Sequence, residues 1–290
     1  FKIADGEGKV VETYTYKETN DKANQVANGL ISKVGVKKGD KVGMYMLNCS
    51  EFVLSILAIH KTGGIQVPIN KDEKGERLAY IINYSDQVAL VVDPSGLSLI
   101  EDIADKLENL KIIYVTGDSA DVPEKIGNIP AESFNSLQEF STENPNVDVQ
   151  ISDKERCMFT SGTTGMPKGV VREHGGVLMT VRSYIQHQGI RNDDTLMSVL
   201  SLGHANAQAM CLFAAIGAGC TAVFFPKFSA SNFWKWAHDC GATVTNFLGA
   251  VAEYLWSAKP GDYDQKHKVR IVLAGPAPRN LKEFEKRFNL

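Results

Sequence analysis

The chain alternates between two patterns of apolar residues, and each pattern predicts a different element. Short, continuously apolar runs are typical of strands buried on both faces of a sheet. Runs of this kind, some of them interrupted by Thr, Ser, Asn or Gln, occur at 42–46, 65–67, 88–92, 112–115, 195–200, 220–225, 243–247 and 269–273. Between them, apolar residues recur every three to four positions and predict amphipathic helices. These helices cover 52–60, 76–83, 97–107 and a segment around 177–185, and an earlier one follows the T-x-x-E capping box at Thr15 and closes at Gly35.

Repeated strand–helix units of this length imply largely parallel sheets covered by helices on both faces. The periodicity lapses between 117 and 153, where Pro123, Pro130 and Pro145 mark a loop-rich connection. We therefore predict the α/β class for this chain.

Composition and charge exclude several classes of protein. A chain of 290 residues with 43% hydrophobic and 22% charged residues is typical of a soluble globular protein with ample core. The net charge of −3 offers no basic field for nucleic acid. No run is apolar enough for an integral membrane segment, and no signal peptide opens the chain, so we expect a cytoplasmic protein. The five cysteines form no C-x-x-C pair and no metal spacing with histidines, so we expect no protein metal site.

A polar loop between two strand-like runs carries the clearest chemical signal. Residues 160–169 read TSGTTGMPKG. Glycines let backbone N–H groups turn toward one point, hydroxyls add donors, and Lys168 adds a positive charge, which together suit a polyphosphate. The run is not a Walker A loop, because Lys168 is followed by Gly169. The alternative is a surface turn rich in Gly, Ser and Thr.

This loop resembles, almost residue for residue, the signature loop of the adenylate-forming superfamily, which includes acyl-CoA synthetases, luciferases and the adenylation domains of peptide synthetases. The resemblance covers nearly the whole chain. It implies two packed, largely parallel β-sheets flanked by helices, as in the large N-terminal adenylation (AMP-binding) domain, here incomplete over 1–290. It further implies that 14–70 and 191–290 form one subdomain and that 71–190 form the other.

Three loops carry the site that the resemblance implies. The residues implied to bind the nucleotide are Thr160, Ser161, Gly162, Thr163, Thr164, Gly165, Lys168, Ala274, Gly275 and Pro276. Those implied to line the acyl pocket are His204, Asn246, Phe247 and Gly249. Two simpler readings stay open: a lone histidine is more often a structural hydrogen-bonding group, and a Gly-Pro pair before a helix is more often a turn.

The implied activity is that of an acid–thiol ligase. ATP, Mg²⁺ and a small-molecule carboxylate would give an acyl-adenylate and pyrophosphate, and coenzyme A would then form the thioester. Residues 228–234 and 242–245 most resemble carnitine/crotonobetaine-CoA ligases and related medium-chain enzymes, which implies a place in fatty acid or carnitine metabolism.

Later motifs of the superfamily do not occur in the sequence: the Tyr-Gly-x-Thr-Glu segment, the Thr-Gly-Asp motif and the C-terminal lid with its lysine. We therefore expect an N-terminal fragment that holds no catalytic residue and is inactive alone. The alternative, from a different class, is a nucleotide-binding or assembly module without catalysis.

Overall fold

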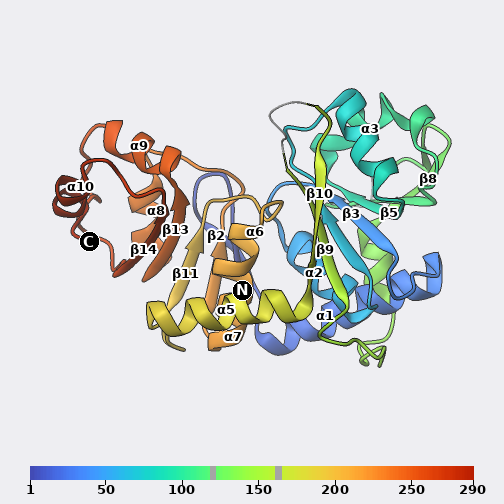
Figure 1. The fold of residues 1–290 in the computed structure, drawn as a ribbon, viewed down its shortest axis with the longest axis horizontal. Coiled ribbons are helices and arrows are strands. Elements are labelled where there is room, and N and C mark those ends of the chain that lie inside the picture. Colours follow the sequence, from blue (N-terminus) through green and yellow to red (C-terminus); the bar gives the residue numbers. More distant parts are fainter. Residues whose placement is uncertain (118–121, 161–164) are drawn as a thin grey trace. The chain divides into compact units, whose positions relative to one another are not determined.

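The computed structural model describes residues 1–117, 122–160 and 165–290. The chain forms two compact units, which Figure 1 shows as ribbons. Unit 1 contains Phe1–Tyr14 and Leu178–Leu290, and unit 2 contains Thr15–Val177. Each unit has its own sheet and its own hydrophobic core.

Unit 2 is built on an eight-stranded sheet with the order β10-β9-β4-β3-β5-β6-β8-β7. Its strands are β3 (Lys41–Tyr45), β4 (Ile65–Pro68), β5 (Gln87–Val92), β6 (Ile112–Val115), β7 (Lys125–Ile126), β8 (Ile129–Ser133), β9 (Lys154–Thr160) and β10 (Lys168–Glu173). The strands from β9 to β8 are parallel, whereas β10 and β7 pair antiparallel at the two edges. The buried strands are the continuously apolar runs of the sequence, because both of their faces are covered.

Helices connect the parallel strands of unit 2. They are α1 (Tyr16–Gly29), the π-helical η1 (Leu30–Val34), α2 (Ser50–Lys61), α3 (Gly75–Tyr84) and α4 (Leu97–Glu101). The predicted capping box is confirmed, since the Thr15 hydroxyl accepts from Glu18 N at 3.1 Å and the Glu18 carboxylate accepts from Thr15 N at 2.8 Å. Gly35, with φ of 73°, ends the helical segment in the left-handed region.

Unit 1 is built on a six-stranded sheet with the order β14-β13-β11-β12-β1-β2. Its strands are β1 (Lys2–Ala4), β2 (Val10–Thr13), β11 (Thr195–Ser198), β12 (Thr221–Phe224), β13 (Val244–Leu248) and β14 (Ile271–Gly275). Only β2 pairs antiparallel within this sheet as described. The helices are α5 (His174–Gln188), which begins in unit 2, α6 (Ala205–Ala207), the π-helical η6 (Gln208–Phe213), α7 (Ala214–Ala218), α8 (Phe233–Asp239), α9 (Gly249–Ser257) and α10 (Leu281–Phe288).

One face of the unit 1 sheet packs on an aromatic core. The rings of Phe225 and Trp236 stack with centroids 5.0 Å apart, and those of Trp234 and Phe288 stack at 4.8 Å. Phe247 joins the same buried cluster. Trp234 and Trp236 of α8 pack here against Phe288 of α10 and against the ring that directly follows β12, so the aromatic group around residues 233–236 is core, as its helical spacing indicated.

The prediction of an α/β fold with two largely parallel sheets flanked by helices is confirmed. The subdomain boundaries differ from the expected ones, which joined 14–70 to 191–290 and separated 71–190. In the structure, β3 and β4 lie inside the unit 2 sheet between β5 and β9, so residues 15–70 belong with 71–177. Residues 1–14 and 178–190 belong to unit 1 instead. A buried apolar strand carries no mark of which sheet it joins, since its pairing is set by contacts distant in sequence.

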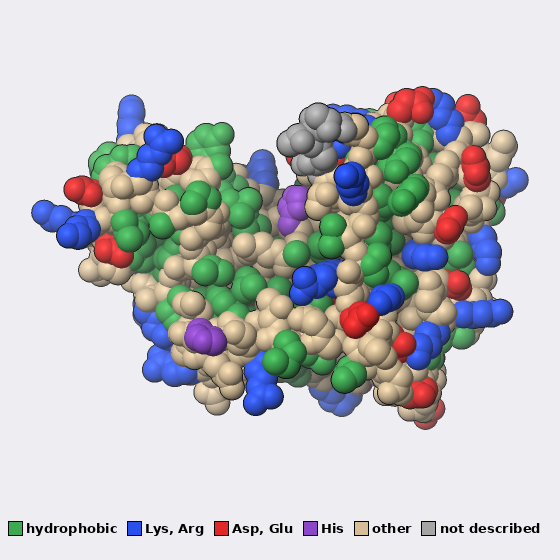
Figure 2. All heavy atoms as spheres, viewed as in Figure 1, with side chains coloured by type: hydrophobic (Ala, Val, Ile, Leu, Met, Phe, Trp, Pro, Cys, Tyr) green, Lys and Arg blue, Asp and Glu red, His purple; other side chains and the backbone are tan. Residues whose placement is uncertain are grey.

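Surface charge agrees with the composition. Lysine and arginine side chains, blue in Figure 2, are scattered over the face in view and form no single basic patch there. Within the described ranges, every helix is too short or too polar to cross a bilayer.

Candidate functional site

The hairpin of β9 and β10 holds the described ends of the predicted phosphate loop. Thr160 ends β9, Lys168 begins β10, and the two are paired in the ladder. The Thr160 hydroxyl donates to the Lys168 carbonyl oxygen at 3.4 Å. Of the predicted loop residues, Ser161, Gly162, Thr163 and Thr164 lie outside the described residues. Because β9 ends at Thr160 and β10 begins at Lys168, the strand-like segments predicted on both sides of the loop are confirmed.

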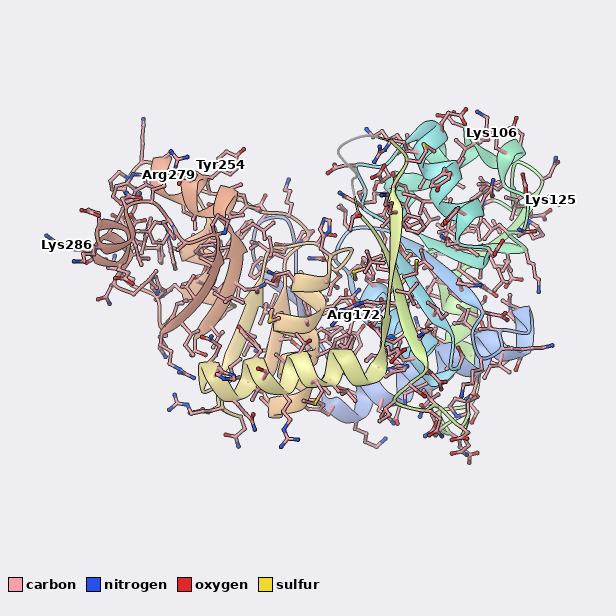
Figure 3. All side chains as sticks on the ribbon, in the orientation of Figure 1. Lys106, Lys125, Arg172, Tyr254, Arg279 and Lys286 are labelled. Atoms are coloured by element: carbon pink, nitrogen blue, oxygen red, sulfur yellow. The ribbon has the colours of Figure 1, made fainter. Side chains whose placement is uncertain are left out.

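The Lys168 side chain is available for a ligand at this hairpin. It is exposed, and its ammonium makes no hydrogen bond or ion pair with the described residues. Gly165 has φ of 126° and open space around it, a backbone conformation that glycine favours. Arg172, which Figure 3 labels, lies further along the same strand. The hairpin can thus present a positive charge where its two strands part.

Behind the hairpin, β9 carries a buried polar group that the sequence did not indicate. Glu155 is fully buried, and its carboxylate lies 3.0 Å from His60 Nε2 and 2.9 Å from Arg156 Nε, while Gln66 Nε2 donates to it at 3.1 Å. Burial alone raises the pKa of Glu155, but the hydrogen bond and charge of His60 and the charge of Arg156 outweigh it and lower that pKa. This group fixes the start of β9 to α2 and β4.

The other predicted loops leave the unit 1 sheet at the carboxyl ends of its parallel strands, which we call the unit 1 edge. In parallel sheets, ligands bind beyond the carboxyl ends of the strands. The loops after β11, β13 and β14 all leave from that edge, because the three strands are parallel neighbours. Of the predicted residues, this edge brings together His204, Asn246, Gly249, Gly275 and Pro276, whereas Ala274 is paired with Phe247 and packs against the aromatic core.

His204 lies in the loop that follows β11. Its side chain is exposed, and the residue caps the short helix α6 in an extended conformation. Its backbone N–H donates to the Ser201 carbonyl oxygen at 3.0 Å. The buried Gln208 amide donates to the Leu202 carbonyl oxygen at 2.8 Å and so fixes the loop to the helical segment that follows it. The loop is thus fixed by its own backbone and by Gln208, which leaves the His204 imidazole pointing to solvent.

Two neighbours on β13 lie on opposite faces of the sheet, as side chains of a strand alternate. Asn246 is 1% exposed and donates from Nδ2 to the Asn206 side-chain oxygen. Phe247 is fully buried on the other face, with its ring centroid 5.9 Å from that of Phe233 and 6.3 Å from that of Phe284. Asn246 and Phe247 therefore do not line one common surface. Asn206, two residues after His204, is the polar residue that the sequence reasoning did not select.

Gly249 and Pro276 bring the loops after β13 and β14 into contact. A Cβ on Gly249 would lie 2.8 Å from both Cδ and Cγ of Pro276, so only glycine fits there without a shift. The preceding residues Leu248 and Gly275 are paired in the ladder, and Gly275 has open space where a side chain would be. Small residues of the two loops, Gly249, Gly275 and Pro276, thus form one continuous surface (the ledge), and a planar ligand can approach its backbone closely.

The opposite, amino end of the same strands is held by a buried carboxylate. Asp194, whose side chain is 1% exposed, accepts from Arg270 Nη2 at 2.5 Å, from the Thr243 hydroxyl at 2.7 Å and from Arg191 N at 2.7 Å. Burial raises the pKa of Asp194, but its bonds to Arg270, Thr243 and the Arg191 backbone outweigh that effect and lower it. Asp194 precedes β11, Thr243 precedes β13 and Arg270 precedes β14, so one side chain fixes the register of the three strands that carry the site.

No group of three His, Cys, Asp or Glu side chains within 1–117, 122–160 and 165–290 is placed to hold a metal ion. The described residues therefore do not form a protein cage for Mg²⁺. Mg²⁺ does not need such a cage, because it usually keeps several waters and binds through substrate phosphates with one or two carboxylates.

Comparison with known proteins gives the family. The model of the AMP-binding enzyme family matches residues 5–289. Crotonobetaine/carnitine–CoA ligase of Escherichia coli strain K12 / DH10B is 31% identical over 291 residues, which cover 98% of this chain and 54% of that protein. The enzyme of the same name from the O157:H7 strain EC4115 gives the same values. The chain thus spans about half the length of the curated relatives it matches.

Solved structures agree on the fold. The anthranilate CoA ligase AuaEII, in complex with anthranoyl-AMP, superposes with a TM-score of 0.87 at 24% identity, covering 100% of this chain and 55% of that one. The inhibitor-bound N-terminal domain of FACL13 from Mycobacterium tuberculosis has a TM-score of 0.85 at 22% identity, covering 99% of this chain and 69% of that one. These likenesses extend over both units of the chain. Taken together with the family match over 5–289, they lead to one assignment: the chain belongs to the family of AMP-binding enzymes.

Proposed function

We propose that this chain supplies the nucleotide and carboxylate sites of an ATP-dependent acyl-CoA ligase. A carboxylate oxygen attacks the α-phosphorus of ATP, which forms an acyl-adenylate and releases pyrophosphate. The thiol of coenzyme A then attacks the acyl carbon, which forms the thioester and releases AMP. Family membership supports this assignment, as do the names of the relatives, which are CoA ligases.

The observation that carries the proposal is the exposed Lys168 ammonium, which has no partner among the described residues, at the end of the β9–β10 hairpin and directly after a loop of glycines and hydroxyls. The attack brings a carboxylate and a polyphosphate together, so negative charge must be balanced where pyrophosphate leaves. In this proposal Lys168 balances that charge. Thr160, Ser161, Thr163 and Thr164 donate to phosphate oxygens, with Gly162 and Gly165 shaping the loop. The nucleotide enters as its magnesium complex, whose phosphates supply most of the metal ligands.

The edge of unit 1 takes the remaining parts of the substrates in this proposal. Ala274, Gly275 and Pro276 lie against the adenine, because a ledge of small residues leaves the backbone accessible. His204, Asn246 and Gly249 lie toward the acyl group. Phe247 supports the strand from the opposite face, since it is buried among aromatic rings. The names of the curated relatives make crotonobetaine and carnitine the first acids to test.

The 290 residues are proposed to be insufficient for turnover. They span 54% of the length of the curated ligases. We therefore place the residues that complete the reaction in a longer protein that contains this chain.

Carboxylate-dependent exchange of labelled pyrophosphate into ATP tests the proposal. A full-length protein that contains this chain is expected to catalyse exchange only when a suitable acid is added, and the 290-residue chain is expected to show none. If the full-length protein binds ATP yet gives no exchange with any acid, the chain is a nucleotide-binding or assembly module instead. Exchange by the 290 residues alone would show that no further sequence is needed.

A further inference from the structure

The unit 1 edge carries a pair of amide side chains, Asn206 and Asn246, the first of them two residues after His204 in sequence. Asn206 lies on α6 after β11, and Asn246 lies on β13. The Asn246 side chain donates from Nδ2 to Asn206 Oδ1 and is 1% exposed. It occupies the face of the sheet opposite the aromatic core that contains Phe247.

An amide pair of this kind leaves one NH₂ group and one carbonyl oxygen wholly free for a third group. Each carboxamide has an oxygen with two lone pairs and an NH₂ with two donors, and the bond between them uses one N–H of Asn246 and one lone pair of Asn206. Among the described residues, nothing else hydrogen-bonds to the Asn246 oxygen or to the Asn206 nitrogen. Turning both amides over exchanges which residue offers the donor but leaves the same pair of groups. The complementary ligand group is one that donates and accepts at the same time, such as a hydroxyl or an amide.

The three unit 1 loops that flank this pair carry no acidic side chain. The loops at 199–207, 246–250 and 274–278 contain no Asp, Glu, Lys or Arg, and His204 is their single titratable side chain. The residue that follows β12 on this edge, Lys227, is a cation and is exposed. The next acid along the edge, Asp5 after β1, is two strands from β11, and its carboxylate accepts from the backbone N–H groups of Glu7 and Lys9 at 2.9 Å each.

The aromatic rings of this unit also face elsewhere. Phe228 packs on the core cluster that contains Phe247, with its ring centroid 6.2 Å from that of Tyr254. Tyr254, labelled in Figure 3, belongs to α9, which covers that same aromatic face. A quaternary ammonium group is recognised by carboxylates or by aromatic faces, and the described loops of unit 1 place neither beside the amide pair.

We propose that the Asn206–Asn246 pair selects an uncharged acyl chain that carries a hydroxyl or an amide, and that it discriminates against quaternary ammonium acids without a hydroxyl, such as crotonobetaine and γ-butyrobetaine. This inference rests on the proposed function, because it takes the edge near His204 as the acyl side of the site. A trimethylammonium group has no N–H and no lone pair, so it leaves both free amide groups unpaired. A hydroxyl satisfies both at once.

Four acids of matched size test the inference in the pyrophosphate exchange of a full-length protein. They are γ-butyrobetaine, its isostere with carbon in place of the ammonium nitrogen, hexanoate and δ-hydroxyhexanoate. One hydrogen bond to substrate is worth roughly tenfold in kcat/KM, so the hydroxy acid is expected to exceed hexanoate by about that factor. The betaine is expected to fall at least about tenfold below its carbon isostere. A betaine that equals or exceeds its isostere overturns the inference.

Variants separate this inference from the proposed function. Asn206→Leu is expected to abolish the preference for the hydroxy acid, and Asn206→Asp is expected to improve the betaine relative to its isostere by about tenfold, both at unchanged KM for ATP. Asn246→Asp provides a second charge reversal if Asn206 variants fold poorly. The matched control is Asn192→Leu, an exposed asparagine at the amino end of β11. If pyrophosphate exchange occurs but the preference among acids is the same in the Asn206 and Asn246 variants as in the unchanged protein, the role of the pair in acid selection is refuted. If no acid supports exchange, the proposed function is refuted and the inference with it.

Discussion

Asp194→Asn perturbs the buried carboxylate that holds the amino ends of β11, β13 and β14. One carboxylate oxygen accepts from Arg270 Nη2 and Arg191 N, and the other accepts from the Thr243 hydroxyl and, at 3.3 Å, from Arg270 Nε. An asparagine keeps the size but replaces one oxygen by an NH₂ group. Whichever way the amide turns, that NH₂ faces donors instead of an acceptor, so the variant cannot preserve the network.

The expected loss follows from the bonds that fail. Two charge-assisted hydrogen bonds are lost or weakened, and each is worth about 1.5–3 kcal/mol. The Arg270 side chain is 34% exposed and can recover some hydration, which reduces the total. We expect Asp194→Asn to lower the free energy of unfolding of unit 1 by about 3 kcal/mol. Its neighbour Asp193, with a side chain 72% exposed, is the matched control, and Asp193→Asn is expected to change it by less than about 0.5 kcal/mol.

Urea titration of the 290-residue chain, followed by tryptophan fluorescence, measures this difference. The three tryptophans, Trp234, Trp236 and Trp256, all belong to unit 1, so their signal reports on the unit that contains Asp194. A lower midpoint at unchanged slope is expected for Asp194→Asn. If Asp194→Asn and Asp193→Asn unfold at the same urea concentration, the carboxylate does not hold the strands and the reasoning is refuted.

Four further changes test other parts of the account. In a full-length protein, Lys168→Ala is expected to lower kcat/KM for ATP, which corresponds to a loss of about 2–4 kcal/mol of transition-state stabilisation, while the melting temperature stays constant. A large fall in melting temperature would indicate a structural role for Lys168. His204→Ala is expected to reorder kcat/KM across a series of acids by about 1–3 kcal/mol at constant KM for ATP, and a preserved order with a raised KM would place His204 on the nucleotide side. Gly249→Ala is expected to destabilise unit 1 by about 1–3 kcal/mol, because its Cβ meets the Pro276 ring, and an unchanged urea midpoint would show that the ring moves away freely. Because folding lowers the pKa of Glu155, the ionised carboxylate stabilises the folded state above its ordinary pKa of 4.5, and this stabilisation is lost as pH falls through the pKa of the folded state. Glu155→Gln is therefore expected to flatten the loss of stability in acid, and an acid profile identical to that of the unchanged chain would contradict this.

The sequence predicted the parallel architecture well because buried strands are marked by continuous apolar runs. The strand predicted at 42–46 is β3 (Lys41–Tyr45), and that at 88–92 lies in β5 (Gln87–Val92). The short strands β7 and β8 fall in the region read as loop-rich, since strands of this length show little periodicity. The π-helical turn η1 was read as the end of an ordinary helix, because apolar spacing does not separate the two helix types.

The site was predicted less completely than the fold, for reasons that particular residues show. The resemblance assigned both Asn246 and Phe247 to the acyl pocket, although the alternation of a strand places them on opposite faces of the sheet. Asn206 had no signal of its own, since a single asparagine in a loop is common. Glu155 lies in a charged run that resembles a solvated segment, and its burial depends on His60 and Gln66, the latter 89 residues away in sequence.

Transfer of a heavy oxygen isotope tests the central claim most directly. If a carboxylate oxygen attacks the α-phosphorus, that oxygen remains on the nucleotide when the thiol of coenzyme A takes the acyl group. A full-length protein that contains this chain, given an acid labelled in both carboxylate oxygens, ATP and coenzyme A, is therefore predicted to release AMP that carries one labelled oxygen per thioester formed. Label in inorganic phosphate, with ADP as the nucleotide product, would contradict the account, because it would show attack at the terminal phosphorus instead.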